Sequence, residues 1–247
     1  MRKILLGVLF VFLFSGCSAA RPMRALAGLP AGALQSTAAL SVNSTPVSQG
    51  KASAPAPGGE AAQGAAEPQE TFDAAHAVKV ELVEGGIQVI FEQLPQTAEE
   101  LEALLSVYPL SDPRNVGAFF VASLVRYVDS ADDGLAMIDL LRGPRPMNGL
   151  DKNFIRDRLR DKTYLPSAYF EGATPENDYT PDAPWTLVVY DDPMEAETGY
   201  FYIQVATTGA DSPRRITLRE KDGLYYLWEY SNVLTGIRLP ASLDPWL

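Results

Sequence analysis

Apolar and polar residues alternate along two short segments near residue 80. The apolar positions are spaced by two: Val78, Val80 and Leu82 in the first segment, and Ile87, Val89 and Phe91 in the second. Gly85 and Gly86 separate the two segments. Alternation on both sides of a glycine pair predicts a β-hairpin, and we expect ordered structure to begin near residue 77.

The next stretch has a helical pattern that is divided by capping residues. Four helices are expected, over about 97–108, 112–128, 132–142 and 148–161. Their starts are marked by residues that cap helices well: Thr97, Asp112, Asp132 or Asp133, and Asn148. The second helix is strongly apolar, which is typical of a helix at the centre of a fold. The third should end at Gly143 and Pro144, a capping glycine followed by a helix breaker.

The rest of the chain is rich in β-branched and aromatic residues. Strands are predicted at 185–190, 199–208, 214–220 and 224–230, with a tight turn at Asp222-Gly223 and a short edge strand at 236–240. Helices followed by consecutive strands indicate an α+β domain in which helices cover one face of an antiparallel sheet of four to five strands. We assign this single domain to residues 77–247.

The N-terminal segment has the pattern of a secretory signal. Arg2 and Lys3 precede an apolar run over residues 4–14, which is too short to span a membrane. The sequence FSGC that follows resembles the lipobox of bacterial lipoproteins, and it implies that Cys17 becomes the lipidated first residue of the mature chain. The alternative is ordinary cleavage after Ala20, which would make the protein secreted.

Residues 17–70 contain mostly Ala, Ser, Pro, Gly and Gln, and they are predicted to form a disordered tether. Cleavage after residue 16 removes two basic residues and no acidic residue, which takes the net charge from −11 to −13. Such a chain is unsuited to nucleic acid or to electrostatic binding of anionic lipid. We therefore expect a protein held on the extracytoplasmic face of the cell membrane by its lipid alone.

Few kinds of catalytic site fit the composition. His76 is the only histidine and Cys17 the only cysteine, so no histidine-based triad, thiolate metal site or cofactor is expected. Carboxylates remain, and Glu171, Glu176 and Asp178 could supply the pair that glycoside hydrolysis requires.

The segment 164–184 is too long for an ordinary connection and too aromatic for a disordered one. A second unusual segment, GADSPRRITLR (209–219), concentrates arginine in an acidic domain. We expect the acids of the long loop to pair with this strand, on which only one of two adjacent arginines can face the loop. The candidate binding residues are Tyr169, Phe170, Glu171, Asn177, Tyr179, Asp211, Arg214 and Arg215.

Several short motifs point to one family. They are SDP (111–113), LLRGPRP (140–146), FIRDRL (154–159), YFEGATPENDYTP (169–181), GADSPRRITLR, LWEY (227–230) with GIRLP, and DPW (244–246). Together they resemble a bacterial domain family of unknown function that occurs in secreted and lipoprotein-like chains. The resemblance covers roughly residues 94–247 and implies no activity, cofactor or catalytic residue.

The sequence thus predicts a membrane-tethered, non-catalytic module that binds a small ligand or an envelope protein. Two alternatives remain open at this point. One is a carboxylate-dependent hydrolase acting on envelope or environmental glycans, and the other is a structural envelope domain.

Overall fold

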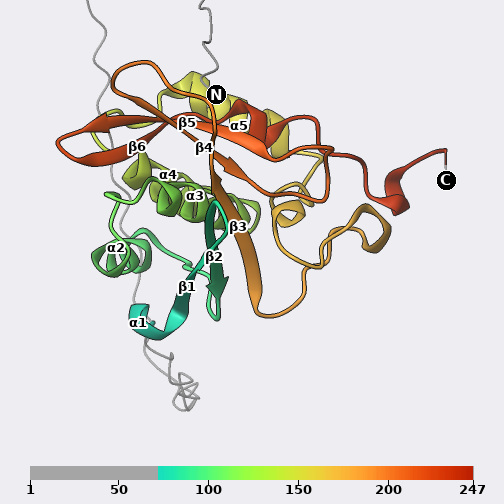
Figure 1. Ribbon diagram of the computed structural model, residues 1–247. Coiled ribbons are helices and arrows are strands. Elements are labelled where there is room, and N and C mark those ends of the chain that lie inside the picture. Colours follow the sequence, from blue (N-terminus) through green and yellow to red (C-terminus); the bar gives the residue numbers. More distant parts are fainter. Residues whose placement is uncertain (1–71, 247) are drawn as a thin grey trace, which may run out of the picture. The chain divides into compact units, whose positions relative to one another are not determined.

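The computed structural model describes residues 72–246. The predicted signal segment 1–16, Cys17 and the tether 17–70 lie outside the described residues. The described part contains five helices: α1 (Ala74–Ala77), α2 (Ala98–Val107), α3 (Pro113–Asp129), α4 (Ala131–Arg142) and α5 (Gly149–Leu159) (Figure 1). The strands are β1 (Val78–Val83), β2 (Gly86–Phe91), β3 (Trp185–Asp191), β4 (Tyr200–Val205), β5 (Arg214–Lys221) and β6 (Leu224–Glu229).

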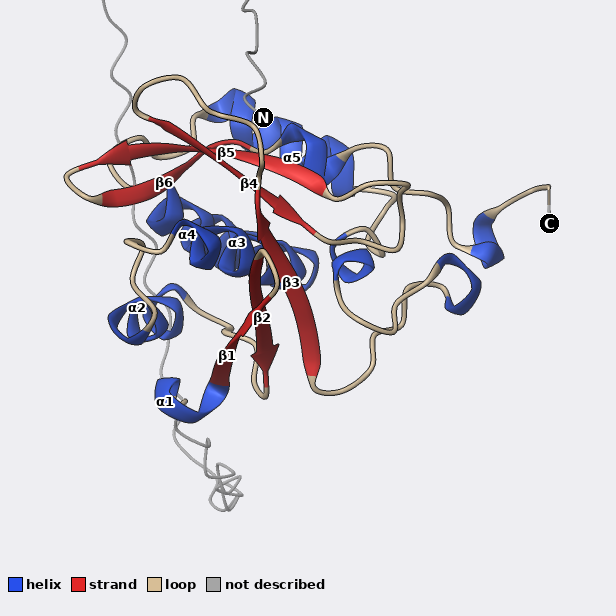
Figure 2. Cartoon of the chain, in the orientation of Figure 1, coloured by secondary structure: helices blue, strands red, loops and turns tan. Residues whose placement is uncertain are grey.

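All six strands form one antiparallel sheet whose spatial order is the order of the sequence. The predicted α+β class is therefore confirmed, and the N-terminal hairpin is part of the main sheet because β2 also pairs with β3. Strands β3 and β4 pair over only three positions, Val189–Asp191 with Ile203–Val205. Figure 2 shows that β1–β3 and β4–β6 consequently run in different directions, as the twist of a sheet accumulates.

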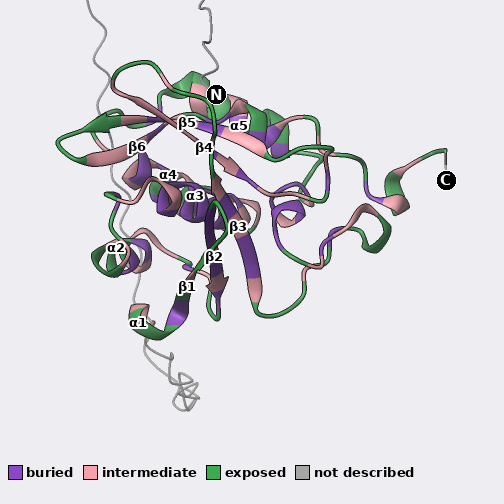
Figure 3. Ribbon diagram, viewed as in Figure 1, coloured by how far each residue is buried: buried purple, intermediate pink, exposed green. Residues whose placement is uncertain are grey.

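Helix α3 lies at the centre of the core. Every residue from Asn115 to Leu124 is buried, as Figure 3 shows for this helix, and α3 contacts β2, β3, β4 and β6. Gly117 makes the close approach possible, because a Cβ atom there would lie 2.7 Å from Cδ1 of Ile203. Helix α4 packs along α3, and α2 packs against α4. The predicted apolar helix is therefore central.

Three of the four predicted helix starts are confirmed, and the predicted cap at Asp132 or Asp133 is wrong. The side chains of Thr97, Asp112 and Asn148 each accept a backbone amide at the start of their helices. At α4, Ser130 occupies the N-cap position, and Asp132 and Asp133 lie in the first turn. Carboxylates there still favour the positive end of the helix dipole.

The predicted edge strand at 236–240 is wrong. Within the described residues this segment makes no ladder with the sheet, and its backbone link to the fold is the bond from the Arg238 amide to the Gly209 carbonyl (2.8 Å). Gly236 has a φ of +68°, which turns the chain away from an extended path, and Pro240 has no amide to donate. The segment is therefore a loop.

Candidate functional site

The aromatic residues of the predicted binding loop are buried in the fold. Tyr169 and Phe170 are each about 2% exposed or less, and the Tyr169 hydroxyl donates to the Val233 carbonyl at 2.6 Å. Tyr179 is equally buried and donates to the Arg238 carbonyl at 3.0 Å. Burial raises the pKa of Tyr179 to about 12, so its hydroxyl stays a donor. Tyr169 and Tyr179 thus fasten the loop to the C-terminal segment, while Phe170 packs against Phe91 and Trp185 of the sheet.

The polar loop residues also serve the fold. Asn177 accepts the amides of Thr174 and Thr180, and its own amide group donates to the carbonyls of Gly172 and Thr180. The Asn177 side chain therefore satisfies backbone groups that a helix or a strand would otherwise pair. Glu171 accepts from the side chain of Gln88 at 2.9 Å.

The expected pairing of loop acids with the arginine strand is wrong. Arg215 instead forms an ion pair with Asp192, in the turn between β3 and β4, at 2.7 Å. Arg214 points to the opposite side of β5 and donates to the Gly236 carbonyl, while Asp211 pairs with Arg238. The carboxylate of Asp192 is fully shielded, and its neighbours supply enough hydrogen bonds to hold it without the loop.

Those hydrogen bonds also set the ionisation of Asp192. Burial alone would raise its pKa, but donation by Gln204, by the Met194 amide and by Arg215 outweighs burial and holds the pKa below its usual value. The predicted candidates Arg215 and Asp211 are thus brought to different turns, and neither meets the acids of the 169–179 loop in the structure.

A different cavity brings three distant segments together. It has a volume of about 360 Å³ and is lined by Arg142, Arg145, Asp151, Phe154, Trp228, Glu229, Tyr230 and Ser231. We call it the Arg142 pocket. Its residues come from the end of α4 and the loop after it, from the first half of α5, and from the end of β6 and the two residues that follow. They fall within three of the quoted motifs or beside them.

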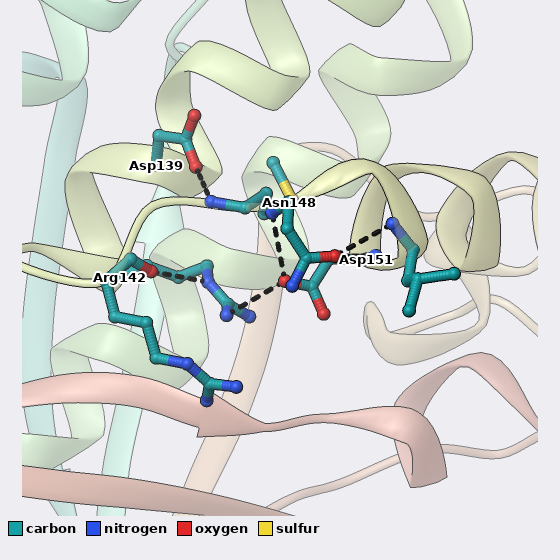
Figure 4. Close-up of polar contacts among 7 residues, drawn as sticks. Asp139, Arg142, Asn148 and Asp151 are labelled. Carbon is teal, nitrogen blue, oxygen red and sulfur yellow. Dashed lines mark hydrogen bonds and ion pairs between the residues drawn. The ribbon is translucent and has the colours of Figure 1, made fainter. Parts of the chain in front are cut away.

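The floor of the Arg142 pocket is a buried ion pair. The Arg142 side chain is 1% exposed, its Nη2 lies 3.1 Å from Oδ2 of Asp151, and its Nε donates to the Arg145 carbonyl at 3.0 Å. Figure 4 shows the Asp151 carboxylate accepting from both Arg142 and the Asn148 amide. Asp139 fixes the connecting loop by accepting the Met147 amide at 2.6 Å. A buried charge that is paired and hydrogen-bonded in this way has a fixed position.

The rim of the pocket is aromatic and cationic. The Arg145 guanidinium carbon lies 4.2 Å from the centroid of the Trp228 ring, a stacked cation–π contact. Tyr230 lies beneath, with Arg142 5.8 Å from its ring centroid, and burial raises its pKa to about 12. The pocket therefore offers a neutral hydroxyl, a guanidinium and an indole at fixed positions.

Two other cavities border the predicted loop. One of about 680 Å³ is lined by Thr174, Glu176, Asp244 and Trp246 among others, and one of about 240 Å³ borders Phe170 and Glu171. Trp246 is 92% exposed, so the larger cavity is an open surface hollow.

Residues 72–246 contain no group of three or more acidic, histidine or cysteine side chains arranged to hold a metal ion. In the same part of the chain, no helix is both long and apolar enough to cross a bilayer.

The family can now be assigned. The model of a domain of unknown function, DUF6935, matches residues 93–241, which is more than half of the chain. The chain belongs to the DUF6935 family. The DUF6935 match includes the whole Arg142 pocket and ends before Asp244 and Trp246, which border the larger hollow. Comparisons with curated proteins and with solved structures gave no match.

Sequence reasoning missed the Arg142 pocket for a physical reason. Arg142 falls in the last turn of a helix, where a basic residue normally offsets the helix dipole in solvent. One signal was available: LLRGPRP, FIRDRL and LWEY are separate motifs, and each contributes side chains to this one cavity. The three motifs come together only because β6 pairs with β5 at the edge of the sheet.

Proposed function

We propose that the protein is a lipoprotein held by Cys17 on the extracytoplasmic face of the membrane, and that its DUF6935 domain binds a ligand in the Arg142 pocket. The tether 17–70 would carry the domain away from the bilayer. The observation that supports binding most directly is the pocket itself, in which a buried ion pair underlies an exposed guanidinium stacked on an indole.

The arrangement favours binding because its polar groups are already fixed. Arg142 and Asp151 satisfy each other and position the loop that carries Arg145. A ligand would therefore meet a preorganised rim and would lose less free energy to ordering of the protein. The volume of about 360 Å³ is in the range of small-molecule pockets.

The same contacts argue against hydrolysis. A glycosidase needs a carboxylic acid with a raised pKa to protonate the leaving group. Within the pocket, Asp151 is paired with Arg142, and Glu229 accepts the Ser231 amide at 2.8 Å.

The pocket can be tested through its own tryptophan. The chain has three tryptophans, so replacing Trp185 and Trp246 by Phe leaves Trp228 as the only indole. A library of small polar fragments, added to the mature chain with Cys17→Ala, should give saturable changes in Trp228 emission. Each active fragment should be recovered chemically unchanged.

A matched chain that keeps only Trp185 serves as the control. Trp185 packs against Phe170 near the 169–179 loop, with ring centroids 4.9 Å apart. Saturable changes at Trp185 with none at Trp228 would contradict the assignment. Conversion of a fragment that binds at Trp228 would favour an enzyme over a binding module.

A further inference from the structure

The Arg142 pocket is one end of a longer row of side chains on the sheet. Arg145 stacks on Trp228, Trp228 meets Tyr200 edge to face with centroids 6.0 Å apart, and Arg219 lies 4.3 Å from the Tyr200 ring centroid. We call these four residues the arginine–aromatic row. Trp228 lies on β6, Arg219 on β5 and Tyr200 on β4, and Arg145 reaches Trp228 from the loop between α4 and α5.

The row lies on the face of the sheet that points away from the core. Tyr200 is directly opposite Arg219 in the β4–β5 register. The residues that alternate with the row in these strands are buried against the helices: Ile203, Val205, Ile216, Leu218 and Leu227. Successive side chains of a strand point to opposite faces, so the row faces outward.

Both guanidiniums of the row lack an acidic partner in the structure. In residues 72–246, neither Arg145 nor Arg219 forms a side-chain hydrogen bond or ion pair, although the chain has 31 acidic residues and 20 basic ones. Arg215 on the same face shows the usual alternative, since it stacks on Tyr202 and also pairs with Asp192. The N–H groups of both guanidiniums are therefore available to a ligand.

The acids next to the row have other partners. Glu220, adjacent to Arg219, accepts the Gly223 amide at 2.9 Å. Glu229, adjacent to Trp228, accepts the Ser231 amide. Both carboxylates accept backbone amides of the neighbouring turns, and neither forms an ion pair with Arg145 or Arg219 in the structure.

A stacked guanidinium is a specific kind of binding group. The ring beneath holds its plane, and its free N–H edges can take a carboxylate by two parallel hydrogen bonds. Beside the two cations, Trp228 and Tyr200 present aromatic surface against which the apolar face of a ring can pack. The complementary ligand carries negative charges that are separated by rings.

From this arrangement we infer that the row binds an acidic glycan, a chain of sugar rings bearing carboxylates, with one end seated at the Arg142 pocket. The inference rests on the proposed function, since Arg145 and Trp228 belong to both sites. Single-stranded nucleic acid also has rings between charges. It is disfavoured because nucleic-acid binding uses a positively charged groove that follows the phosphate backbone, whereas the row offers two separate guanidiniums, each suited to two parallel hydrogen bonds with one carboxylate.

Polygalacturonate is a suitable probe, and its fully methyl-esterified form is the neutral match. Binding to the mature Cys17→Ala chain would be measured by titration calorimetry in low salt. We expect binding of the acidic polymer that weakens as sodium chloride is added, and at least about tenfold weaker binding of the esterified polymer.

Arg219 provides the variants. Arg219→Gln should weaken polygalacturonate binding by about tenfold. Arg219→Lys should weaken it less, because lysine keeps the positive charge but lacks the planar guanidinium that can donate two parallel hydrogen bonds. Lys79→Gln removes one charge from β1, at the opposite edge of the sheet, and should leave binding within about twofold. Melting temperatures equal to that of the parent chain would show that Arg219→Gln and Arg219→Lys are both folded.

Three results would overturn the inference. They are equal binding of the acidic and esterified polymers, equal loss in Lys79→Gln and Arg219→Gln, and tighter binding of an oligothymidylate than of polygalacturonate. If small fragments still bind at Trp228, such a result refutes only the inference that the ligand is an acidic glycan. If fragments also fail at Trp228, the proposed binding function is refuted with it.

Discussion

Replacing Asp151 by Asn removes the charge that holds Arg142 in the pocket floor while keeping the size of the side chain. In the structure the Arg142 side chain is 1% exposed and that of Asp151 is 24% exposed. The substitution would leave a guanidinium out of water beside a neutral amide. It would also weaken the bond that Asp151 accepts from the Asn148 amide at 3.2 Å.

The magnitude follows from the burial of the two partners. Removing one partner of a fully buried pair costs about 3–5 kcal/mol. The substituted side chain would keep one acceptor oxygen, and water reaches part of this position, so we expect a loss of about 2–3 kcal/mol. For a domain of this size, each kcal/mol lowers the melting temperature by about 2–4 °C. The variant should therefore melt about 4–12 °C below the parent.

Urea denaturation followed by circular dichroism provides the measurement, with an unchanged slope as evidence that the same transition is observed. Asp157→Asn is the matched control, because it makes the same change on the same helix. Asp157 is 59% exposed and pairs with Arg160 at 3.1 Å, so its loss should cost under about 1 kcal/mol. Equal losses for the two variants would refute the claim that the pocket floor is a buried ion pair.

Four further outcomes are expected. Gly143→Ala should destabilise the domain by about 2 kcal/mol or more in urea, because Gly143 has a φ of +54° and a Cβ atom there would lie 2.3 Å from Cε1 of Tyr226. Asn177→Ala should increase cleavage within the 169–179 loop during brief proteolysis, since its side chain holds four backbone groups. Asp192→Asn should lower stability at pH 7, and its deficit should shrink as the pH falls below about 4, where the depressed pKa of Asp192 no longer stabilises the fold. Cys17→Ala should move the protein from the membrane fraction to the soluble fraction, because the lipid is its proposed anchor.

Each of these has an outcome that would count against it. Gly149→Ala is the control for Gly143, since a Cβ atom at Gly149 meets nothing within 4 Å, and an equal effect of both would exclude the steric reason. A proteolysis pattern unchanged by Asn177→Ala would mean that the loop has other support. A deficit for Asp192→Asn that is constant from pH 7 to pH 3 would contradict the lowered pKa. Retention of the Cys17→Ala chain in membranes would exclude the lipid as anchor.

Most of the fold was predictable because its signals are local. Alternating apolar residues marked β1 and β2, and the capping side chains of Thr97, Asp112 and Asn148 marked three helix starts that the structure confirms. The strand predicted at 236–240 failed for a local reason as well. The apolar residues there suggested the alternation of a strand. The positive φ of Gly236 breaks the extended path, and the sequence alone does not specify that backbone angle.

The site was harder to predict because its contacts are not local. Arg142 and Trp228 are separated by 86 positions and meet because β6 forms the edge of the sheet beside the end of α4. The chain has 31 acidic residues that could pair with Arg215. We expected the partner among the acids of the conspicuous 164–184 loop, and that expectation was wrong. Asp192 was selected by the β3–β4 turn, which places its carboxylate 2.7 Å from Nε of Arg215.

Crystals of the mature Cys17→Ala chain, soaked with a library of small polar fragments, would test the central claim most directly. The account predicts that bound fragments appear in the Arg142 pocket, in contact with Trp228 and within hydrogen-bonding distance of Arg145. Fragments found only in the hollow beside Glu176 and Trp246, with the Arg142 pocket empty, would contradict it.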